Sequence, residues 1–304
     1  MASLKDIRGR ISSVKNIRKI TRAMEMISAA RLRRAEQRIE HLRPYADAIR
    51  RMTSRASQAA DNIPNLPILQ EKEQVSTVGI LLVTGDRGLA GPFNSQIIRA
   101  GNRRAAELRS DGVDVLWYAS GRRGVSSLTF RGREAKGQYT GHTDRPAYAN
   151  AREIADDVVA AYVDGELDRV EVFYNGYVSP LTQEVRREVL LPMQQATVSE
   201  ASEMQEDLAE DQAEETGHTA LTEYEPEPGE ILSRLVPDYV EISIYRALLE
   251  STASEHGARM TAMRNASENA SEIIDDLTLQ LNRERQADIT QEIMEVVAGA
   301  ESLV

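Results

Sequence analysis

Two long amphipathic stretches, one at each end of the chain, constrain the fold more than any other feature of the 304-residue sequence. In the first stretch apolar residues recur every three or four positions, which is the spacing of one face of an α-helix. These residues are Leu4, Ile7, Ile11, Val14, Ile17, Ile20, Met24 and Ile27, followed by Ala35, Ile39, Leu42, Ala46, Ile49 and Met52. A helix over about residues 4–58 would be roughly 80 Å long, which exceeds the diameter of an ordinary domain. Pro44 should kink or locally unwind this helix, because proline lacks a backbone donor.

The C-terminal stretch has the same periodicity. No proline follows Pro237, and the glycines after it are Gly257 and Gly299. Its apolar stripe consists of Met263, Ala266, Ala270, Ile273, Leu277, Leu281, Ile289, Ile293 and Val296. The alternation of large and small residues lets a partner helix approach closely. Two such stripes with a domain between them can bury each other by running antiparallel, whereas two separate helices packed on a globular core are the alternative.

Between these stretches, strand and helix patterns alternate. The run TVGILLVT at 77–84 is continuously apolar or β-branched, which is typical of a buried parallel strand. Further strands are predicted at 113–119 and 169–175, and helices at about 92–109 and 146–163. This alternation is typical of a small doubly wound sheet.

The predicted fold class is therefore α/β, with a long antiparallel two-helix coiled coil formed by both termini and a central Rossmann-like α/β domain. The predicted domains are an N-terminal coiled-coil helix at 1–60, a central α/β domain at 61–231 and a C-terminal coiled-coil helix at 232–304.

Charge is distributed very unevenly along the chain. Residues 1–60 hold 15 Lys or Arg against 5 Asp or Glu, whereas residues 199–230 hold 12 acidic residues and no Lys or Arg. The basic helix indicates an acidic partner, with nucleic acid, an anionic membrane surface or a plain solvated helix face as alternatives. The acidic residues 199–222 contain few large apolar side chains, so we expect a mobile insert there.

No catalytic constellation emerges from the sequence. GDRGLAG at 85–91 follows a predicted strand, but it is neither a dinucleotide nor a Walker-type loop, so a tight strand-to-helix turn is expected. The chain contains no cysteine, and its four histidines lack metal-ligand spacing. His41 and His256 are expected on solvated helix faces. No apolar run reaches the ~18 residues that span a bilayer.

The last sixteen residues form an unusual helix end. Residues 289–304 contain no Lys or Arg, although helices usually carry a basic residue in the last turn. Such an apolar end suits an uncharged sleeve made by another protein. The alternative is docking on its own coiled-coil partner.

Three stretches in this order resemble one family. They are IRGRISSVKNIRKITRAMEMISAARLRRAE at 7–36, GDRGLAGPFN at 85–94, and ITQEIMEVVAGAES at 289–302, with YEPEPGEIL at 224–232 in support. Together they resemble the gamma subunit, the central shaft, of F-type rotary ATP synthases.

The resemblance implies a non-catalytic rotor subunit that couples ion-driven rotation to ATP synthesis on the beta subunits. It implies contacts with the alpha and beta subunits, the epsilon subunit and the membrane c-ring, on the cytoplasmic face of a bacterial plasma membrane. It implies no cofactor, metal, nucleic acid or directly bound nucleotide.

The resemblance also implies roles for particular residues. Those matching beta-subunit contacts are Lys19, Arg22, Met24, Glu25, Asp86, Arg87, Ala90, Arg259, Gln286 and Thr290. Those matching a bearing inside the alpha–beta sleeve are Ile293, Val296, Val297, Ala300, Leu303 and Val304.

Some features depart from the family pattern. Ala90 stands where a cysteine is often found, and the chloroplast-type regulatory cysteine pair is absent. The acidic insert is longer than expected, and we hypothesise that it tunes coupling or docks on a basic neighbour. Unchanged ATP hydrolysis and proton pumping after deletion of 199–222 would rule this out. The alternative function is a nucleotide-binding α/β enzyme with helical arms.

Overall fold

The computed structural model describes residues 4–59, 68, 72, 74–180, 182–193 and 228–301. The acidic segment 199–222 and the predicted bearing residues Leu303 and Val304 lie outside the described residues. The chain forms two compact units, one comprising residues 1–30 with 259–304 and the other residues 31–258. The sequence-based domain boundaries at 60 and 231 lie at the expected ends of the long helices and differ from these units. They stay a prediction.

The two predicted long helices are present. Helix α1 spans Leu4–Ala59 and helix α6 spans Pro228–Glu301. Both helices contribute residues to both units. Each continues through an internal proline, Pro44 in α1 and Pro237 in α6, so the chain does not unwind at Pro44. The alternative of a kink at Pro44 stays a prediction.

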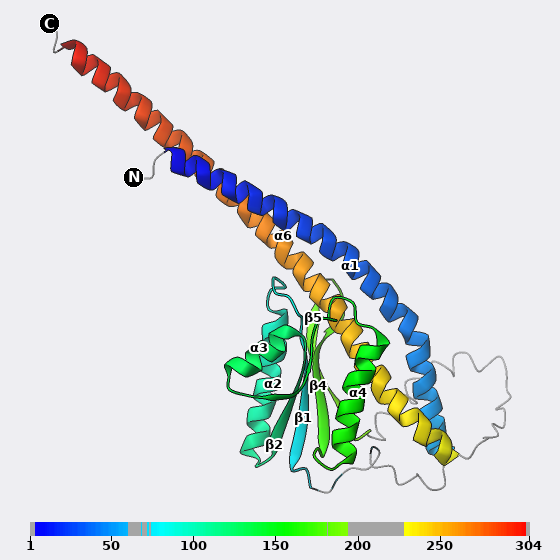
Figure 1. Ribbon diagram of the computed structural model, residues 1–304. Coiled ribbons are helices and arrows are strands. Elements are labelled where there is room, and N and C mark those ends of the chain that lie inside the picture. Colours follow the sequence, from blue (N-terminus) through cyan, green and yellow to red (C-terminus); the bar gives the residue numbers. More distant parts are fainter. Residues whose placement is uncertain are drawn as a thin grey trace, which may run out of the picture. The chain divides into compact units, whose positions relative to one another are not determined.

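The larger unit contains a five-stranded sheet in the order β3-β2-β1-β4-β5. The strands are β1 (Thr77–Val83), β2 (Asp114–Ser120), β3 (Ala135–Tyr139), β4 (Arg169–Tyr177) and β5 (Gln183–Leu191). The first four are mutually parallel, and β5 pairs antiparallel with β4. The helices between strands are α2 (Phe93–Ser110), α3 (Arg122–Phe130) and α4 (Tyr148–Val163) (Figure 1).

The α/β prediction is confirmed, but three elements were not predicted. Strand β3 has only five residues, and helix α3 has nine, so each is too short for periodicity to reveal. Strand β5, QEVRREVLL, carries charged residues and is only partly buried over most of its length. An edge strand of this kind lacks the continuous apolar run that marks β1.

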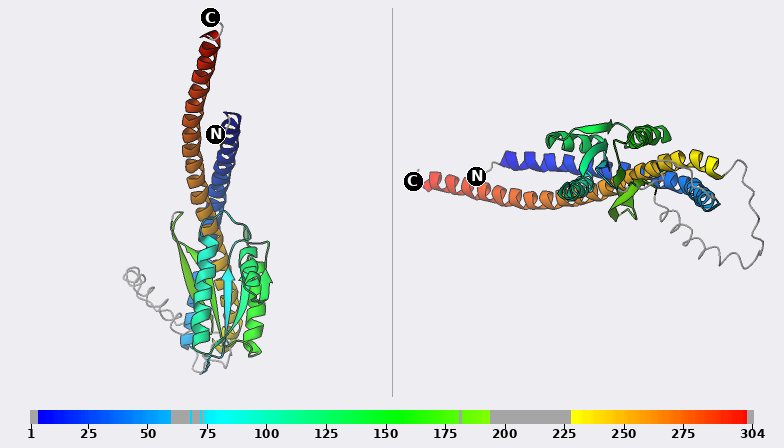
Figure 2. Two further views of the ribbon diagram at one scale, coloured as in Figure 1. Left: turned by 90° about the vertical axis from the view of Figure 1, so that its left-hand side faces the viewer. Right: turned by 90° about the horizontal axis from the view of Figure 1, so that it is seen from below.

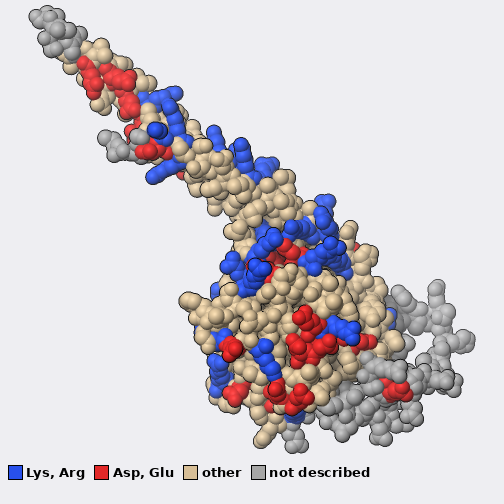
Figure 3. All heavy atoms as spheres, in the orientation of Figure 1, with Lys and Arg blue, Asp and Glu red and all other residues tan. Residues whose placement is uncertain are grey.

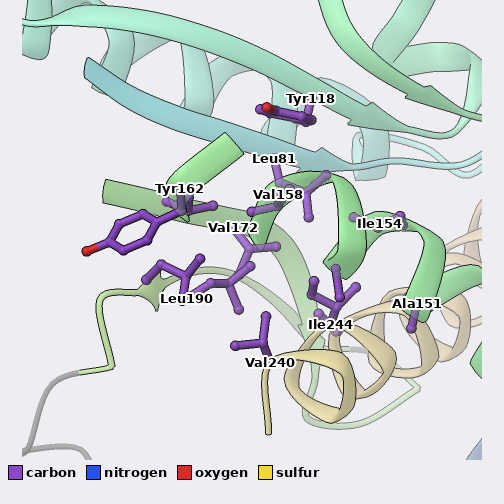
Figure 4. Close-up of a cluster of buried hydrophobic side chains, with 14 of the residues drawn as sticks. Leu81, Tyr118, Ala151, Ile154, Val158, Tyr162, Val172, Leu190, Val240 and Ile244 are labelled. Carbon is purple, nitrogen blue, oxygen red and sulfur yellow. The ribbon is translucent and has the colours of Figure 1, made fainter. Parts of the chain in front are cut away.

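Each face of the sheet has its own apolar core. On one face, Leu81 and Val172 pack with Ile154 and Val158 of α4 and with Ile244 of α6 (Figure 4). On the other face, side chains of β1 and β2 pack against α2 and α3. The only tryptophan of the chain, Trp117, belongs to this second core and is buried, so its fluorescence reports on folding of the larger unit.

The turn after β2 depends on a glycine. Gly121 has a φ of 95°, and a Cβ there would lie 2.1 Å from the Thr84 carbonyl oxygen. A side chain would therefore combine left-handed strain with a backbone clash between the ends of β1 and β2. The Thr84 hydroxyl also accepts a hydrogen bond from the Gly124 amide at 2.9 Å, which holds the start of α3 to β1.

We expect Gly121→Ala to lower the free energy of unfolding of the larger unit by about 3 kcal/mol, because strain and overpacking add. Urea unfolding followed by Trp117 fluorescence measures this loss. Gly132→Ala is the matched control: Gly132 has a φ of 68°, but a Cβ there would have no neighbouring atom within 4 Å. It should cost about 1 kcal/mol. Equal losses in the two variants would contradict the clash.

In the smaller unit, α1 and α6 pack together as an antiparallel pair (Figure 2). Ile7 and Ile11 pack with Ile274, as an apolar seam requires. Between Val14 and Ala35 the predicted seam is wrong. Ile17, Ile20 and Ile27 are 53%, 59% and 53% exposed, whereas Thr21 and Ser28 are buried.

Small hydroxyl side chains explain this change of seam. The Ser28 hydroxyl donates to the Met24 carbonyl at 2.7 Å, and the Thr21 hydroxyl donates to the Arg18 carbonyl at 3.0 Å. Because the helix's own backbone satisfies both hydroxyls, they are buried at little cost. On α6 the seam likewise passes through buried Ala270 and Ile274, and Ile273 is exposed. In the stretch from Thr21 to Ser28, small residues thus define the packed face of α1, and the neighbouring large apolar residues lie outside it.

Candidate partner-binding surfaces

The large apolar residues excluded from the seam form a stripe along α1. Ile17, Ile20, Met24 and Ile27 are spaced by three and four positions, so they lie on one helix face. Three of them are more than half exposed, and Met24 is partly buried. We call these four residues the isoleucine stripe. Exposed apolar surface of this kind makes the stripe a candidate for protein association.

The charged residues predicted beside this stripe differ in availability. Lys19 and Arg22 are exposed, as a contact surface requires. The Glu25 carboxylate instead accepts a hydrogen bond from Arg264 Nε of α6 at 3.0 Å. Glu25 therefore holds the two helices of the smaller unit together, and its charge is partly neutralised before any partner binds.

Among the described residues, no helix covers α6 from 285 to 298. Every described side chain from 285 to 298 is exposed, and Figure 2 shows this end of α6 continuing alone past the start of α1. Gln286 and Thr290 are exposed here, with the Thr290 hydroxyl donating to the Gln286 carbonyl at 2.9 Å. Docking of this end on its own coiled-coil partner is therefore excluded for these residues.

The exposed end of α6 is rich in apolar side chains. The apolar side chains that are about half exposed or more are Ile289, Ile293, Met294, Val296 and Val297. Ile293, Val296 and Val297 are predicted bearing residues. The side chain of Ala300 lies outside the described ones, as do Leu303 and Val304. An isolated helix with this much apolar surface requires a surrounding partner to cover it.

The loop between β1 and α2 is organised by Asp86. Its carboxylate accepts hydrogen bonds from the Arg122 amide at 3.0 Å, the Gly141 amide at 2.9 Å and the Thr143 hydroxyl at 3.0 Å. Arg122 begins α3 directly after β2, and Gly141 and Thr143 lie in the loop after β3, so one side chain joins the carboxyl ends of three parallel strands. Burial raises the pKa of Asp86, but the hydrogen bonds outweigh burial and the net pKa is lowered.

We expect Asp86→Asn to cost the larger unit about 2 kcal/mol at neutral pH, because an amide nitrogen would face backbone N–H donors. Since the folded pKa is lowered, the stabilising contribution of Asp86 is present above pH 3.8 and is lost as the pH falls through the folded pKa. Urea unfolding from pH 7 to pH 2 should therefore show a shallower acid loss in Asp86→Asn than in the parent chain. Parallel profiles would contradict this role.

The other two residues predicted in this loop lie differently. Ala90 is 2% exposed and packs in the core under α2, so its side chain cannot meet a partner. Arg87 is exposed and lies 3.4 Å from a carboxylate oxygen of Asp144. Leu89, which no sequence pattern selected, is 64% exposed with a φ of 64°. Its loop position between two glycines gave no periodic signal, although an exposed leucine in a strained turn suits a contact.

The same loop is unsuited to phosphate. A Cβ at Gly85 would lie 2.6 Å from Glu255 Oε1, so a carboxylate of α6 sits against the start of the loop. Asp86 adds a second negative charge there, and like charges would repel a nucleotide phosphate. Gly85 is required by the close approach of α6, which accounts for this glycine without a ligand.

Two positions expected at the surface are buried. Arg259, a predicted contact residue, is nearly fully buried. His256, predicted on a solvated face, is 1% exposed, so that prediction is wrong; His41 is exposed as predicted. The helical pattern did not show that this part of α6 packs within the larger unit, where most residues from 247 to 258 are buried on all sides.

One serine–histidine pair gave no signal in the sequence. Ser120 Oγ lies 3.0 Å from His142 Nε2, and burial lowers the pKa of His142. Ser120 is fully buried at the end of β2, so no substrate can reach its hydroxyl. The pair therefore contributes to packing of the strand ends and does not form a nucleophilic site.

Within the residues that the structure describes, no group of three or more potential metal ligands is found. No helix in the described ranges is long and apolar enough to cross a membrane.

These features define a class of protein: a chain with a two-helix unit and a small α/β unit, with exposed apolar surfaces on its long helices. The sequence model of the family described as ATP synthase matches residues 3–303. ATP synthase gamma chains of Rubrobacter xylanophilus and Desulfitobacterium hafniense are 41% and 42% identical, over 100% of this chain and 99% and 100% of theirs. The chain therefore belongs to the family of ATP synthase gamma chains.

Solved structures agree with this fold. The central stalk of the Tetrahymena thermophila mitochondrial ATP synthase is similar with a TM-score of 0.58 and 26% identity, covering 82% of this chain and 99% of that one. A chain of the Euglena gracilis mitochondrial enzyme has a TM-score of 0.64 at 15% identity, covering 99% of this chain and 94% of its own.

Proposed function

We propose that this chain is the rotor shaft of an ATP synthase, coupling ion-driven rotation to ATP synthesis on the catalytic subunits. The observation that carries the proposal is the bare end of α6, where every described side chain from 285 to 298 is exposed. Exposed apolar surface of this extent on a helix is suited to a partner that surrounds it. A hexameric sleeve of alpha and beta subunits is such a partner.

The shaft would act through its asymmetry. The isoleucine stripe lies on one side of α1, so a turning shaft presents apolar and polar faces alternately to each surrounding subunit. A subunit that binds the apolar face more tightly in one conformation is driven toward that conformation. Chemistry would remain on the beta subunits, and this chain would carry coupling free energy between distant sites.

Individual contacts follow from exposure. The exposed polar residues proposed to face the beta subunit are Lys19 and Arg22 beside the stripe, and Gln286 and Thr290 on α6. In the loop after β1, the proposed contacts are Arg87 and Leu89. Asp86 is not proposed, because its carboxylate accepts hydrogen bonds within the loop region, and Ala90 is not proposed, because it is buried in the core. Arg259 is proposed to support the shaft from inside. Ile293, Val296 and Val297 are proposed as bearing residues, with Ala300, Leu303 and Val304 continuing that surface.

The remaining partners are proposed at a coarser level. The epsilon subunit and the c-ring are the proposed neighbours of the α/β domain, and the complex would lie on the cytoplasmic face of a bacterial plasma membrane. Support comes from the similar Tetrahymena chain, which belongs to a central stalk solved with its c-ring.

The proposal is tested by purifying the chain, tagged, from its native membranes. We expect two kinds of nucleotide-binding subunit in threefold excess over the chain, together with ATP hydrolysis that the isolated chain lacks. Isolation of the chain without such subunits would overturn the proposal. If the purified chain alone bound ATP with micromolar affinity, the alternative of a nucleotide-binding α/β enzyme would be favoured instead.

A further inference from the structure

A small pocket in the larger unit is lined mainly by arginines. It has a volume of about 200 Å³ and lies among α1, the loop after β3 and α6. Its lining residues are Arg31, Arg34, Ala35, Arg38, Asp144, Arg145, Thr252 and His256. We call it the arginine pocket. In Figure 3 basic side chains gather around a few acidic atoms in this part of the larger unit.

The positive charge of the pocket is not balanced. Asp144 is the one acidic residue among the lining residues, and its Oδ2 lies 2.9 Å from Arg31 and 3.4 Å from Arg87. Arg34, Arg38 and Arg145 take part in none of the ion pairs between described residues. Several guanidinium groups around one hollow repel one another, and this repulsion is relieved when an anion enters.

The pocket is built on a firm frame. Arg31, Arg34 and Arg38 are spaced by three and four residues, so they share one face of α1. Ala35 between them is buried, which lets this face lie close to the rest of the unit. The Thr252 hydroxyl lies 2.9 Å from the Thr143 carbonyl and ties α6 to the loop that carries Asp144 and Arg145. The arginines are therefore presented from fixed backbone positions.

We propose that the arginine pocket binds a phosphate group, either as inorganic phosphate or at the end of a larger molecule. The planar guanidinium fork matches two phosphate oxygens, and this pairing is stronger than a neutral hydrogen bond. The volume is below the roughly 300–1,000 Å³ of pockets for drug-sized ligands. It therefore suits a single phosphate or pyrophosphate and not a whole nucleotide. None of the lining residues comes from the loop after β1, although Arg87 of that loop pairs with Asp144. The proposal does not depend on the rotor function.

Calorimetric titration of the full chain with inorganic phosphate, pyrophosphate and phosphoserine, at constant ionic strength in chloride, tests the proposal. We expect saturable binding of at least inorganic phosphate or pyrophosphate, weakened at least tenfold in the double variant Arg34→Gln/Arg38→Gln. Arg103→Gln is the matched control, because Arg103 is an exposed arginine of α2 outside the pocket. It should change affinity less than twofold.

The double variant Arg34→Lys/Arg38→Lys keeps the positive charges but removes the planar guanidinium groups. It should bind phosphate with an affinity between those of the parent chain and the glutamine variant. Trp117 fluorescence checks that each variant is folded. Phosphoserine binding as tight as phosphate would indicate a phosphate carried by a larger molecule, and binding of the free ions alone would indicate inorganic phosphate. Absence of saturable binding, unchanged affinity in the glutamine variant, or equal weakening in Arg103→Gln would overturn the proposal. Any nucleotide binding that survives in the glutamine variant would bear on the proposed function and not on this pocket.

Discussion

Replacing Ile17, Ile20 and Ile27 together with glutamine is expected to leave the isolated chain folded and to weaken its assembly with the catalytic subunits by at least a hundredfold. All three side chains are more than half exposed, so substitution removes little buried surface from the chain itself. Glutamine is also a good helix former. Burial of one isoleucine side chain in a partner is worth about 1.5–3 kcal/mol, and 1.4 kcal/mol changes affinity tenfold.

Reconstitution of the variant with purified alpha and beta subunits, followed by size-exclusion chromatography and ATP hydrolysis, measures the effect. Met26→Gln is the control, because Met26 is exposed on α1 but lies off the isoleucine stripe. The control should assemble almost normally. If the triple variant assembles and turns over ATP like the parent chain, the stripe is not a contact surface. If it fails to fold, the assignment of these residues to an exposed face is wrong.

Removal of the Glu171 side chain is expected to be the most destabilising single change in the larger unit. Glu171 is fully buried on β4, where Arg104 Nη2 of α2 lies 3.1 Å from Oε1 and Arg187 Nε of β5 lies 3.2 Å from Oε2. This carboxylate therefore joins a helix and two strands. Glu171→Ala would leave two guanidinium groups without their shared partner, at a cost of about 3–5 kcal/mol.

Urea unfolding followed by Trp117 fluorescence measures this loss, since Trp117 lies in the core on the same face of the sheet as α2. Glu107→Ala is the matched control: Glu107 also pairs with Arg104, at 3.4 Å, but its side chain is half exposed. An exposed pair of this kind contributes about 0–1 kcal/mol. The triple variant Glu171→Leu/Arg104→Met/Arg187→Met should regain most of the stability, because apolar side chains then replace the whole network. A small loss in Glu171→Ala would show that water reaches the site.

The sequence predicted the architecture because its strongest signals are long and repetitive. The 56 and 74 residues of α1 and α6 give many turns of periodicity, and the β1 run is continuously apolar. Short elements gave no comparable signal, so α3, β3 and β5 were missed. Periodicity also assumes that the largest apolar residues face the partner helix. That assumption failed at Ile17 and Ile20, because buried Thr21 and Ser28 satisfy their hydroxyls within α1.

Some of the predicted contact residues are exposed and others are buried. Sequence likeness selects positions but not exposure, so it included Ala90 and Arg259, which are buried, and omitted exposed Leu89. The arginine pocket could not have been predicted, because its residues come from three segments more than 100 positions apart. Only the packing of α1 and α6 in the larger unit brings them to one hollow.

The bare end of α6 also has a mechanical consequence. Where α1 and α6 pack together, torque passes through two helices joined by side-chain contacts such as Arg264 with Glu25. Past the start of α1 the same torque passes through one helix, whose described side chains make no contact with a second one. A single helix twists and bends more easily than a packed pair, so elastic strain collects in this end when it is held and the paired part is turned. Within the smaller unit, the paired part of α1 and α6 is therefore stiffer than the unpaired end of α6.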